Sequence, residues 1–133
     1  MLKYHFKKYI FYICILFIIF TFDRVTKLYV INIFDNISKA EIYINEFLNI
    51  ILIWNSGIGF GLFSSNESFY YNLITSLIIF INIFIIYLSL IADKIRSYMY
   101  VIILGGSLGN LFDRLYYSAV PDFIDLNYNG LHW

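Results

Sequence analysis

The chain has 133 residues, of which 61% are hydrophobic, 22% aromatic and only 14% charged. This composition excludes an ordinary water-soluble domain of that length, because too few polar side chains are present to cover its surface. The formal net charge is zero, so nucleic acid is not an expected partner. Long uncharged runs predict helices that cross a lipid bilayer, since a helix satisfies its own backbone polar groups there.

The first apolar run, from Tyr9 to Phe22, follows three lysines among the first eight residues. Its fourteen residues would span only about 21 Å, short of the roughly 30 Å hydrocarbon core, so the helix is predicted to span about residues 9–29. No small-x-small cleavage site follows, which favours a retained helix over a cleaved signal peptide. The lysine-rich flank predicts a cytoplasmic N-terminus. Cys14, inside the run, is the only cysteine and is assigned a packing role.

The stretch "DRVTK" places Asp23 and Lys27 four residues apart, on one face of the predicted helix and in the favourable order for an ion pair. Two interpretations remain open. The pair anchors the helix at the outer membrane surface, or it is a polar element of a site at that surface, since ionisable groups at such depth often serve function.

The section from about residue 31 to residue 68 is too polar to span a membrane. Its charged residues interrupt the short β-prone pieces "EIYI" and "LNIILIWN", which predict a few strands outside the membrane. The section includes "NSGIGFG", from Asn55 to Gly61, whose glycines permit positive φ and close approach of the backbone to a ligand.

Two further spans are predicted, at about 69–92 and 99–116, joined by a short basic loop that contains Lys94 and Arg96. The basic loop is expected in the cytoplasm, which agrees with the orientation of the first helix. The predicted fold class is therefore an all-α membrane protein of one domain, with three transmembrane helices and a small β-containing section. That section and the tail, 117–133, are expected on the outer face, where all the unusual polar stretches converge.

The third span carries two features. Gly105 and Gly109 stand four residues apart, a spacing that lets another helix pack closely against the backbone. Asn110, Asp113 and Arg114 fall at i, i+3 and i+4, which gathers an amide, a carboxylate and a guanidinium at the outer helix end. Either Asp113 and Arg114 form a charge pair that stabilises the helix terminus, or Asn110 and Arg114 offer donors to a substrate backbone.

The segment "VPDFIDL" holds two carboxylates, Asp122 and Asp125. Peptide hydrolysis without a metal or a nucleophilic side chain needs two carboxyl groups that share one proton. Asp125 would lie on the same face as Asp122 only in a helix, and a solvated turn is the simpler interpretation. The chain has no His or Cys cluster with metal spacing and no Ser or Cys beside a plausible base, so neither a metal nor a cofactor is predicted.

Four stretches in this order, "DRVTK", "NSGIGFG", "GGSLGNLFDR" and "VPDF", together resemble the lipoprotein signal peptidase family (signal peptidase II), a membrane aspartic peptidase of bacteria. The resemblance implies removal of the signal peptide from prolipoproteins just before a diacylglyceryl-modified cysteine. It also implies a multi-pass protein of the cytoplasmic (inner) membrane, in contact with membrane lipid, with its active site at the outer face and no metal or cofactor.

Asp122 matches the first of the family's two catalytic aspartates, and Asp113 matches an aspartate better regarded as structural support. The resemblance implies that five further polar positions hold substrate or order the active site, namely Asp23, Lys27, Asn55, Asn110 and Arg114.

The family's second catalytic aspartate lies in an Asn-x-Ala-Asp motif that opens a fourth membrane helix, and these 133 residues contain no such motif. Asp125 does not occupy the missing position. The sequence is therefore expected to be C-terminally truncated and impaired in activity, because one carboxylate cannot make both proton transfers. The alternative is a non-catalytic small membrane protein, a degenerate relative that binds lipidated peptide or a partner helix through Gly105 and Gly109.

Overall fold

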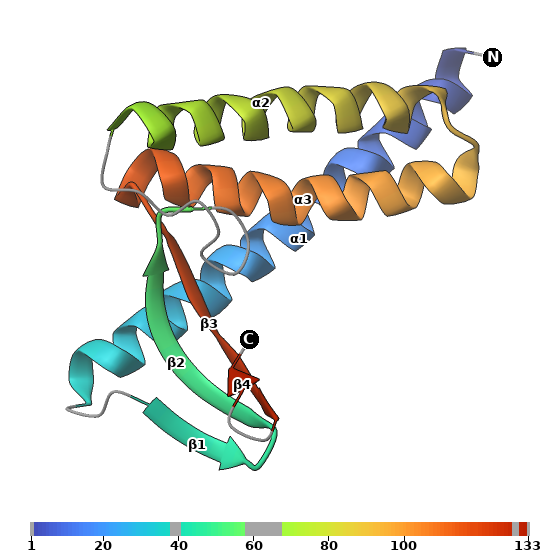
Figure 1. Cartoon of the computed structure of the whole chain (residues 1–133). Helices are drawn as coiled ribbons and strands as arrows, with labels where there is room; N and C mark the ends of the chain where they lie inside the picture. Colours follow the sequence, from blue (N-terminus) through green and yellow to red (C-terminus); the bar gives the residue numbers. More distant parts are fainter. Residues whose placement is uncertain (1, 38–40, 58–67, 129–130, 133) are drawn as a thin grey trace.

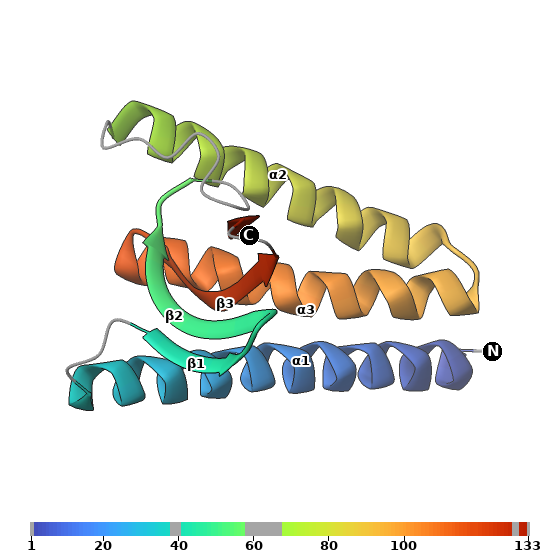
Figure 2. The same cartoon turned by 60° about the horizontal axis from the view of Figure 1, so that its bottom comes forward.

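The computed structural model describes residues 2–37, 41–57, 68–128 and 131–132. Its helices are α1 (Leu2–Asn36), α2 (Ser68–Ile91) and α3 (Lys94–Tyr117), and its strands are β1 (Glu41–Asn45), β2 (Leu48–Asn55), β3 (Val120–Tyr128) and β4 (Leu131–His132). Helices α2 and α3 form an antiparallel hairpin, and α3 packs against both α1 and α2. Figure 2 shows α3 between the other two helices.

The strands form one antiparallel sheet in the order β1-β2-β3-β4, which lies beside the C-terminal half of α1 (Figure 1). Strands β2 and β3 pair Ile50 with Ile124 and Asn55 with Val120, and a bulge between Ile50 and Ile53 brings Ile53 opposite Asp122. The sheet therefore carries its polar residues back to the end of α3.

The turn between α2 and α3 is closed by side chains that hydrogen-bond to the backbone. Asp93 caps α3 by accepting the backbone N–H of Arg96 at 2.9 Å, and this bond and the Arg96 side chain lower the pKa of the Asp93 carboxyl. The hydroxyl of Ser97, which is fully buried, donates to the carbonyl of Ser89 at 2.8 Å. The hairpin is thereby fixed at the end opposite the sheet.

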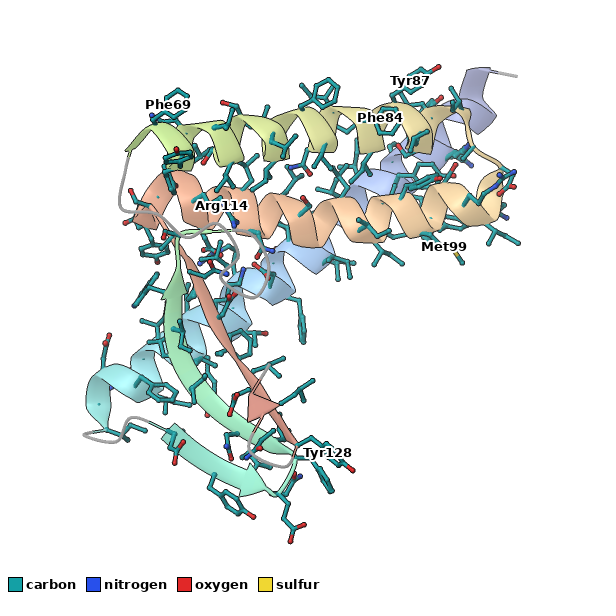
Figure 3. All side chains as sticks on the ribbon, in the orientation of Figure 1. Phe69, Phe84, Tyr87, Met99, Arg114 and Tyr128 are labelled. Atoms are coloured by element: carbon teal, nitrogen blue, oxygen red, sulfur yellow. The ribbon has the colours of Figure 1, made fainter. Side chains whose placement is uncertain are left out.

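Burial in this molecule is inverted relative to a water-soluble protein. In the described part of the chain, six large apolar side chains and Pro121 are buried, against eleven polar or charged ones. Large apolar side chains instead cover the outside of α2, including Phe69, Phe84 and Tyr87, which are 69%, 51% and 56% exposed (Figure 3). Apolar surface of this kind is stable in lipid and costly in water.

Two of the described helices are long and apolar enough, by length and composition, to cross a membrane: Lys7–Asn36 within α1 and Phe69–Ile91 within α2. The third predicted span, 99–116, lies in α3. It falls outside that group because its glycines and the polar residues from Asn110 to Arg114 lower its hydropathy.

The predicted helix-rich architecture with a small β section is confirmed: "EIYI" forms most of β1, and "LNIILIWN" forms all of β2. The structure differs from expectation at two places. Helix α1 runs to Asn36, past the predicted end at residue 29, because no helix-breaking residue interrupts it. The tail, 117–133, contributes β3 and β4, because pairing with β2 supplies partners for its backbone that its own sequence does not reveal.

Candidate active site

The polar residues singled out in the sequence lie at one end of the helical hairpin, where α3 ends and β2 and β3 reach it. Figure 3 shows Arg114 at this end of α3, above the start of β3. Helix α1 passes the same place in its second half, which brings Asp23 and Lys27 against α3. The expected convergence of these stretches is therefore present in the fold.

A buried cluster of charges joins α1 to α3. The carboxylate of Asp113, fully shielded at 0% exposure, accepts Arg24 Nη1 at Oδ1 and Lys27 Nζ at Oδ2, the latter at 2.6 Å. Lys27 Nζ also donates to Asn110 Oδ1 at 2.7 Å and pairs with Asp23 Oδ1 at 3.0 Å. Two acids and two bases thus balance one another, as buried charges require.

The two glycines of α3 allow this close approach. A Cβ atom at Gly105 would lie 2.8 Å from Cβ of Ile19, and one at Gly109 would lie 2.7 Å from Cγ of Asp23 and closer still to its Oδ2. Real Cβ contacts are not that short, so only glycine permits this packing. The predicted helix-packing role of Gly105 and Gly109 is confirmed.

A second cluster surrounds Asp122 on β3. Asn55 Nδ2 donates to Asp122 Oδ2 at 2.8 Å, and Asn55 Oδ1 accepts the backbone N–H of Gly57, also at 2.8 Å. The guanidinium of Arg114 donates through Nη2 to the carbonyl of Gly57 and through Nη1 to the carbonyl of Asn110, the latter at 3.4 Å. Arg114 therefore links the cluster around Asp122, through Gly57, to the buried cluster of charges between α1 and α3, through Asn110.

Exposure divides the six predicted site residues into two groups. Lys27, Asn55 and Arg114 are only 5%, 6% and 5% exposed. Asp122 and Asn110 are exposed, and Asp23 is half-buried. The exposed groups are the most accessible to a bound molecule, and the buried ones are held in place by their neighbours. The geometry brings all six together, and their individual roles stay a prediction.

Two of the interpretations considered for acidic residues are wrong, one for Asp113 and one for Asp125. Asp113 does not pair with Arg114, because Arg24 and Lys27 from α1 hold its carboxylate. Asp125 lies neither in a solvated turn nor on a helix: it is 4% exposed on β3, with Asn49 Nδ2 donating to it at 3.3 Å. Side chains alternate along a strand, so Asp125 and Asp122, three positions apart, face opposite sides of the sheet.

Part of the glycine-rich stretch lies outside the described residues, which include Asn55, Ser56 and Gly57 but not residues 58–67. Within the described ranges, no group of three His, Cys, Asp or Glu side chains is arranged to hold a metal ion.

Arg24 and Tyr71 belong to the site and were not predicted. Arg24 lies between Asp23 and Lys27 in sequence, so three charges at i, i+1 and i+4 on an apolar helix are the signal that would have found it. Its guanidinium also lies 4.8 Å from the ring centroid of Phe112.

Tyr71, one of thirteen tyrosines, has no distinguishing sequence signal. Its hydroxyl donates to the carbonyl of Arg114.

Comparison with known proteins decides the family. The family model of signal peptidase (SPase) II matches residues 15–133. A lipoprotein signal peptidase of Pelagibacter ubique (strain HTCC1062) is 47% identical over 131 residues, which are 98% of this chain and 79% of that protein. The chain belongs to the signal peptidase II family. A second family member, the lipoprotein signal peptidase of Anaplasma phagocytophilum (strain HZ), is 37% identical over 123 residues, which are 91% of this chain and 76% of that protein.

The fold agrees with this membership of the signal peptidase II family. A solved structure described as a bacterial membrane enzyme, determined by the in meso method at 2.3 Å resolution, superposes with a TM-score of 0.71 at 28% identity and covers 92% of this chain and 75% of that one. A second such structure, at 1.9 Å resolution, gives a TM-score of 0.63 at 29% identity. The predicted family and its peptidase function are confirmed: the chain is a bacterial membrane peptidase of signal peptidase II type.

Proposed function

We propose that the chain removes signal peptides from lipoprotein precursors and that Asp122 is one of the two carboxylates that do the chemistry. The observation that carries this proposal is the setting of Asp122. Its side chain is exposed, yet buried Asn55 donates to its Oδ2 atom at 2.8 Å and fixes its direction. The charges of Lys27 and Arg114 both lie close enough to interact with it. An exposed carboxylate in a rigid setting suits proton transfer.

The other nearby carboxylates are poor candidates for the same task. Asp113 and Asp23 are engaged with cations, and Asp125 faces the opposite side of β3. In an aspartic peptidase one carboxylate acts as base on water while the other protonates the carbonyl or the leaving nitrogen. The resemblance assigns the second carboxylate to an Asn-x-Ala-Asp motif, which the 133 residues do not contain. Asp122 is thus one half of the pair.

Substrate binding falls to the exposed groups around Asp122. Asn110 accepts Lys27 at its Oδ1 atom, and within the described part of the chain its Nδ2 group donates to nothing, so both protons remain for a substrate carbonyl. Ile53 and Ile124, 54% and 61% exposed, lie on the Asp122 face of the sheet. An apolar surface beside a polar site suits a peptide that carries a diacylglyceryl-modified cysteine, and membrane lipid borders the helices.

The proposed setting is the cytoplasmic (inner) membrane of a bacterium, crossed by three spans with the N-terminus in the cytoplasm. Two basic flanks support this orientation, one at the start of α1 and one that contains Lys94 and Arg96 between α2 and α3. They lie at the end of the molecule opposite Asp122, so they would leave the active site at the outer face.

A processing assay in cells tests the role of Asp122. The chain, joined after residue 133 to the Asn-x-Ala-Asp motif and following helix of a family member, is expressed in a bacterium depleted of its own signal peptidase II, and conversion of a tagged prolipoprotein to its mature form is followed on gels. This extended chain is expected to restore processing, and Asp122→Asn in it is expected to lower the rate about 100-fold or more, because asparagine cannot exchange the proton. Asp125→Asn makes the same change on the same strand and is expected to retain processing.

Two results would contradict the proposal. The extended chain could fail to process the prolipoprotein although it is present in the membrane, or Asp122→Asn in the extended chain could process it at the rate seen without the substitution.

A further inference from the structure

A continuous run of hydrogen bonds connects α2 to Asp122. The hydroxyl of Tyr71 donates to the carbonyl of Arg114, and Arg114 Nη2 donates to the carbonyl of Gly57. The backbone N–H of Gly57 donates to Asn55 Oδ1 at 2.8 Å, and Asn55 Nδ2 donates to Asp122 Oδ2 at 2.8 Å. Four bonds thus lead from a helix with no predicted site residue to the exposed carboxylate.

The direction of each bond in this run follows from its chemistry. A guanidinium only donates, and a backbone N–H only donates, so Gly57 requires an oxygen from Asn55. That requirement orients the Asn55 amide, whose Nδ2 atom then faces the carboxylate of Asp122, where only a donor is satisfactory. Gly57 therefore decides which end of Asn55 meets Asp122.

Tyr71 acts at a weak point of the backbone, the C-terminal turn of α3. Carbonyls in the last turn of a helix depend on the capping residues for their hydrogen bonds. The carbonyl of Arg114 accepts the backbone N–H of Ser118 at 3.1 Å, where Ser118 adopts the left-handed conformation with φ 60°. The hydroxyl of Tyr71 adds a second donor to that carbonyl, from a different helix. Arg114 is consequently held at both ends, at its carbonyl by Tyr71 and at its guanidinium by Gly57.

We propose that Tyr71 is a positioning residue of the peptidase. Its hydroxyl links α2 to the end of α3 and, through Arg114, holds the carboxylate of Asp122 in its orientation. The inference rests on the proposed catalytic role of Asp122. Tyr71 touches no reacting atom in this assignment. Its contribution is to hold a catalytic carboxylate within the narrow range of positions that proton transfer requires, about 0.5 Å.

The variant Tyr71→Phe isolates the hydroxyl, because the ring and its packing remain. Tyr70→Phe is the matched control, since it removes a hydroxyl one residue away on the same helix. The Tyr70 side chain is 49% exposed and packs on the ring of Phe69, and its hydroxyl makes no hydrogen bond within the described part of the chain. Any effect of the lost hydroxyl on helix stability in general is common to both variants.

The first measurement is amide hydrogen exchange of the purified protein in detergent, which needs no enzymatic activity. Tyr71→Phe is expected to speed exchange at the amides of Gly57 and Ser118 by roughly three- to tenfold, the range set by one lost neutral hydrogen bond. Tyr70→Phe is expected to leave both amides unchanged. Unchanged exchange at Gly57 in Tyr71→Phe would overturn the inference, and so would an equal effect of Tyr70→Phe.

The second measurement is the steady-state cleavage of a diacylglyceryl peptide by membranes that contain each variant in the chain extended by the Asn-x-Ala-Asp motif and following helix of a family member. Tyr71→Phe is expected to lower kcat roughly three- to tenfold, because the orientation of the Asp122 carboxylate changes. KM is expected to stay nearly unchanged, because the exposed groups that bind the substrate keep their positions. Faster exchange with an unchanged kcat would overturn the inference, since Tyr71 would then be merely structural.

The two proposals can fail separately. If Asp122→Asn retains processing while Tyr71→Phe loosens Gly57, the catalytic role of Asp122 fails and the hydrogen-bonded run stands without that purpose. If Asp122→Asn is inactive and Tyr71→Phe leaves Gly57 unaltered, the proposed function stands and the inference about Tyr71 fails.

Discussion

Asp113 shows how strongly a single buried charge depends on its partners. Its carboxylate has no exposed surface, and both oxygens face cations from α1, Arg24 and Lys27. Lys27 is shared with Asp23, so without Arg24 one lysine would have to balance two carboxylates. A buried carboxylate that lacks its counter-charge is costly, so Arg24 is expected to stabilise the contact between α1 and α3.

Arg24→Gln is therefore expected to lower the free energy of unfolding in detergent by about 2 to 3 kcal/mol, because Asp113 keeps only part of its compensation. The double variant Arg24→Gln with Asp113→Asn restores the charge balance and is expected to recover part of that loss. Thermal or SDS-induced unfolding, followed by circular dichroism, measures both.

Arg96→Gln provides the control for this charge effect. Its side chain is 68% exposed and pairs with Asp93 at the turn, so no measurable change is expected. If Arg24→Gln is as stable as the unmodified protein, or if the double variant is less stable than the single one, charge compensation by Arg24 is not what holds Asp113.

Individual residues were only partly predictable from the sequence. The ion pair of Asp23 and Lys27 follows from their spacing and is present at 3.0 Å. The pairing of Arg24 with Asp113 joins residues 89 positions apart, and local spacing carries no signal for it. The resemblance gives Arg114 a part in holding substrate or ordering the active site, but its burial and its bond to Gly57 have no signal in the sequence, because the backbone after β2 reaches the end of α3 only in the fold.

At the scale of elements, the α1–α3 contact depends on two glycines that let the helix backbones approach. Gly106, next to Gly105 in sequence, lies on another face of α3, where a Cβ atom would meet nothing within 4 Å. Neighbouring glycines of one helix therefore differ in what they tolerate, and the difference gives a matched test.

Gly105→Ala and Gly109→Ala are each expected to destabilise the protein by about 1 to 3 kcal/mol, the usual cost of forcing a methyl group into a closely packed contact. Gly109→Ala should in addition displace the carboxylate of Asp23 and lower activity. Gly106→Ala is expected to be neutral or slightly stabilising, since alanine favours helix. Unfolding in detergent measures the stability of all three variants. If Gly105→Ala is as stable as the unmodified protein, α1 can move away from α3 without loss of stability, and the close contact is not required.

The helices and first two strands were predictable because each reveals itself in local hydrophobicity. Strand β3 was not, although "VPDFIDL" contains β-prone residues. Its strand character depends on backbone pairing with β2, from Val120 opposite Asn55 to Leu126 opposite Leu48. Only that pairing separates Asp122 and Asp125 onto opposite faces of the sheet.

The whole molecule is polar inside and apolar outside, which is the arrangement that lipid favours. Its long helices share one polar end, where the sheet and the candidate active site lie, and one basic end. Because basic flanks stay in the cytoplasm, the two ends are expected on opposite sides of the membrane.

This orientation can be tested with single cysteines in a Cys14→Ala background. A membrane-impermeant maleimide is expected to label Tyr128→Cys in intact spheroplasts and to label Lys94→Cys only after permeabilisation. Both side chains are exposed, so access to the reagent depends on the side of the membrane alone. The reverse pattern would contradict the proposed orientation, and labelling of both in intact spheroplasts would contradict a span between them.

The sequence by itself determined the membrane class, the helix-rich fold with a small β section, the family and the end of the molecule at which the polar motifs meet. These properties follow from composition, basic flanks and short motifs, which are local. Only the tertiary structure decided which polar groups are exposed, which carboxylate each cation holds, and how Tyr71 and Asn55 connect to Asp122. Those contacts join residues such as Asn55 and Asp122, 67 positions apart, and depend on how closely the helices and strands pack.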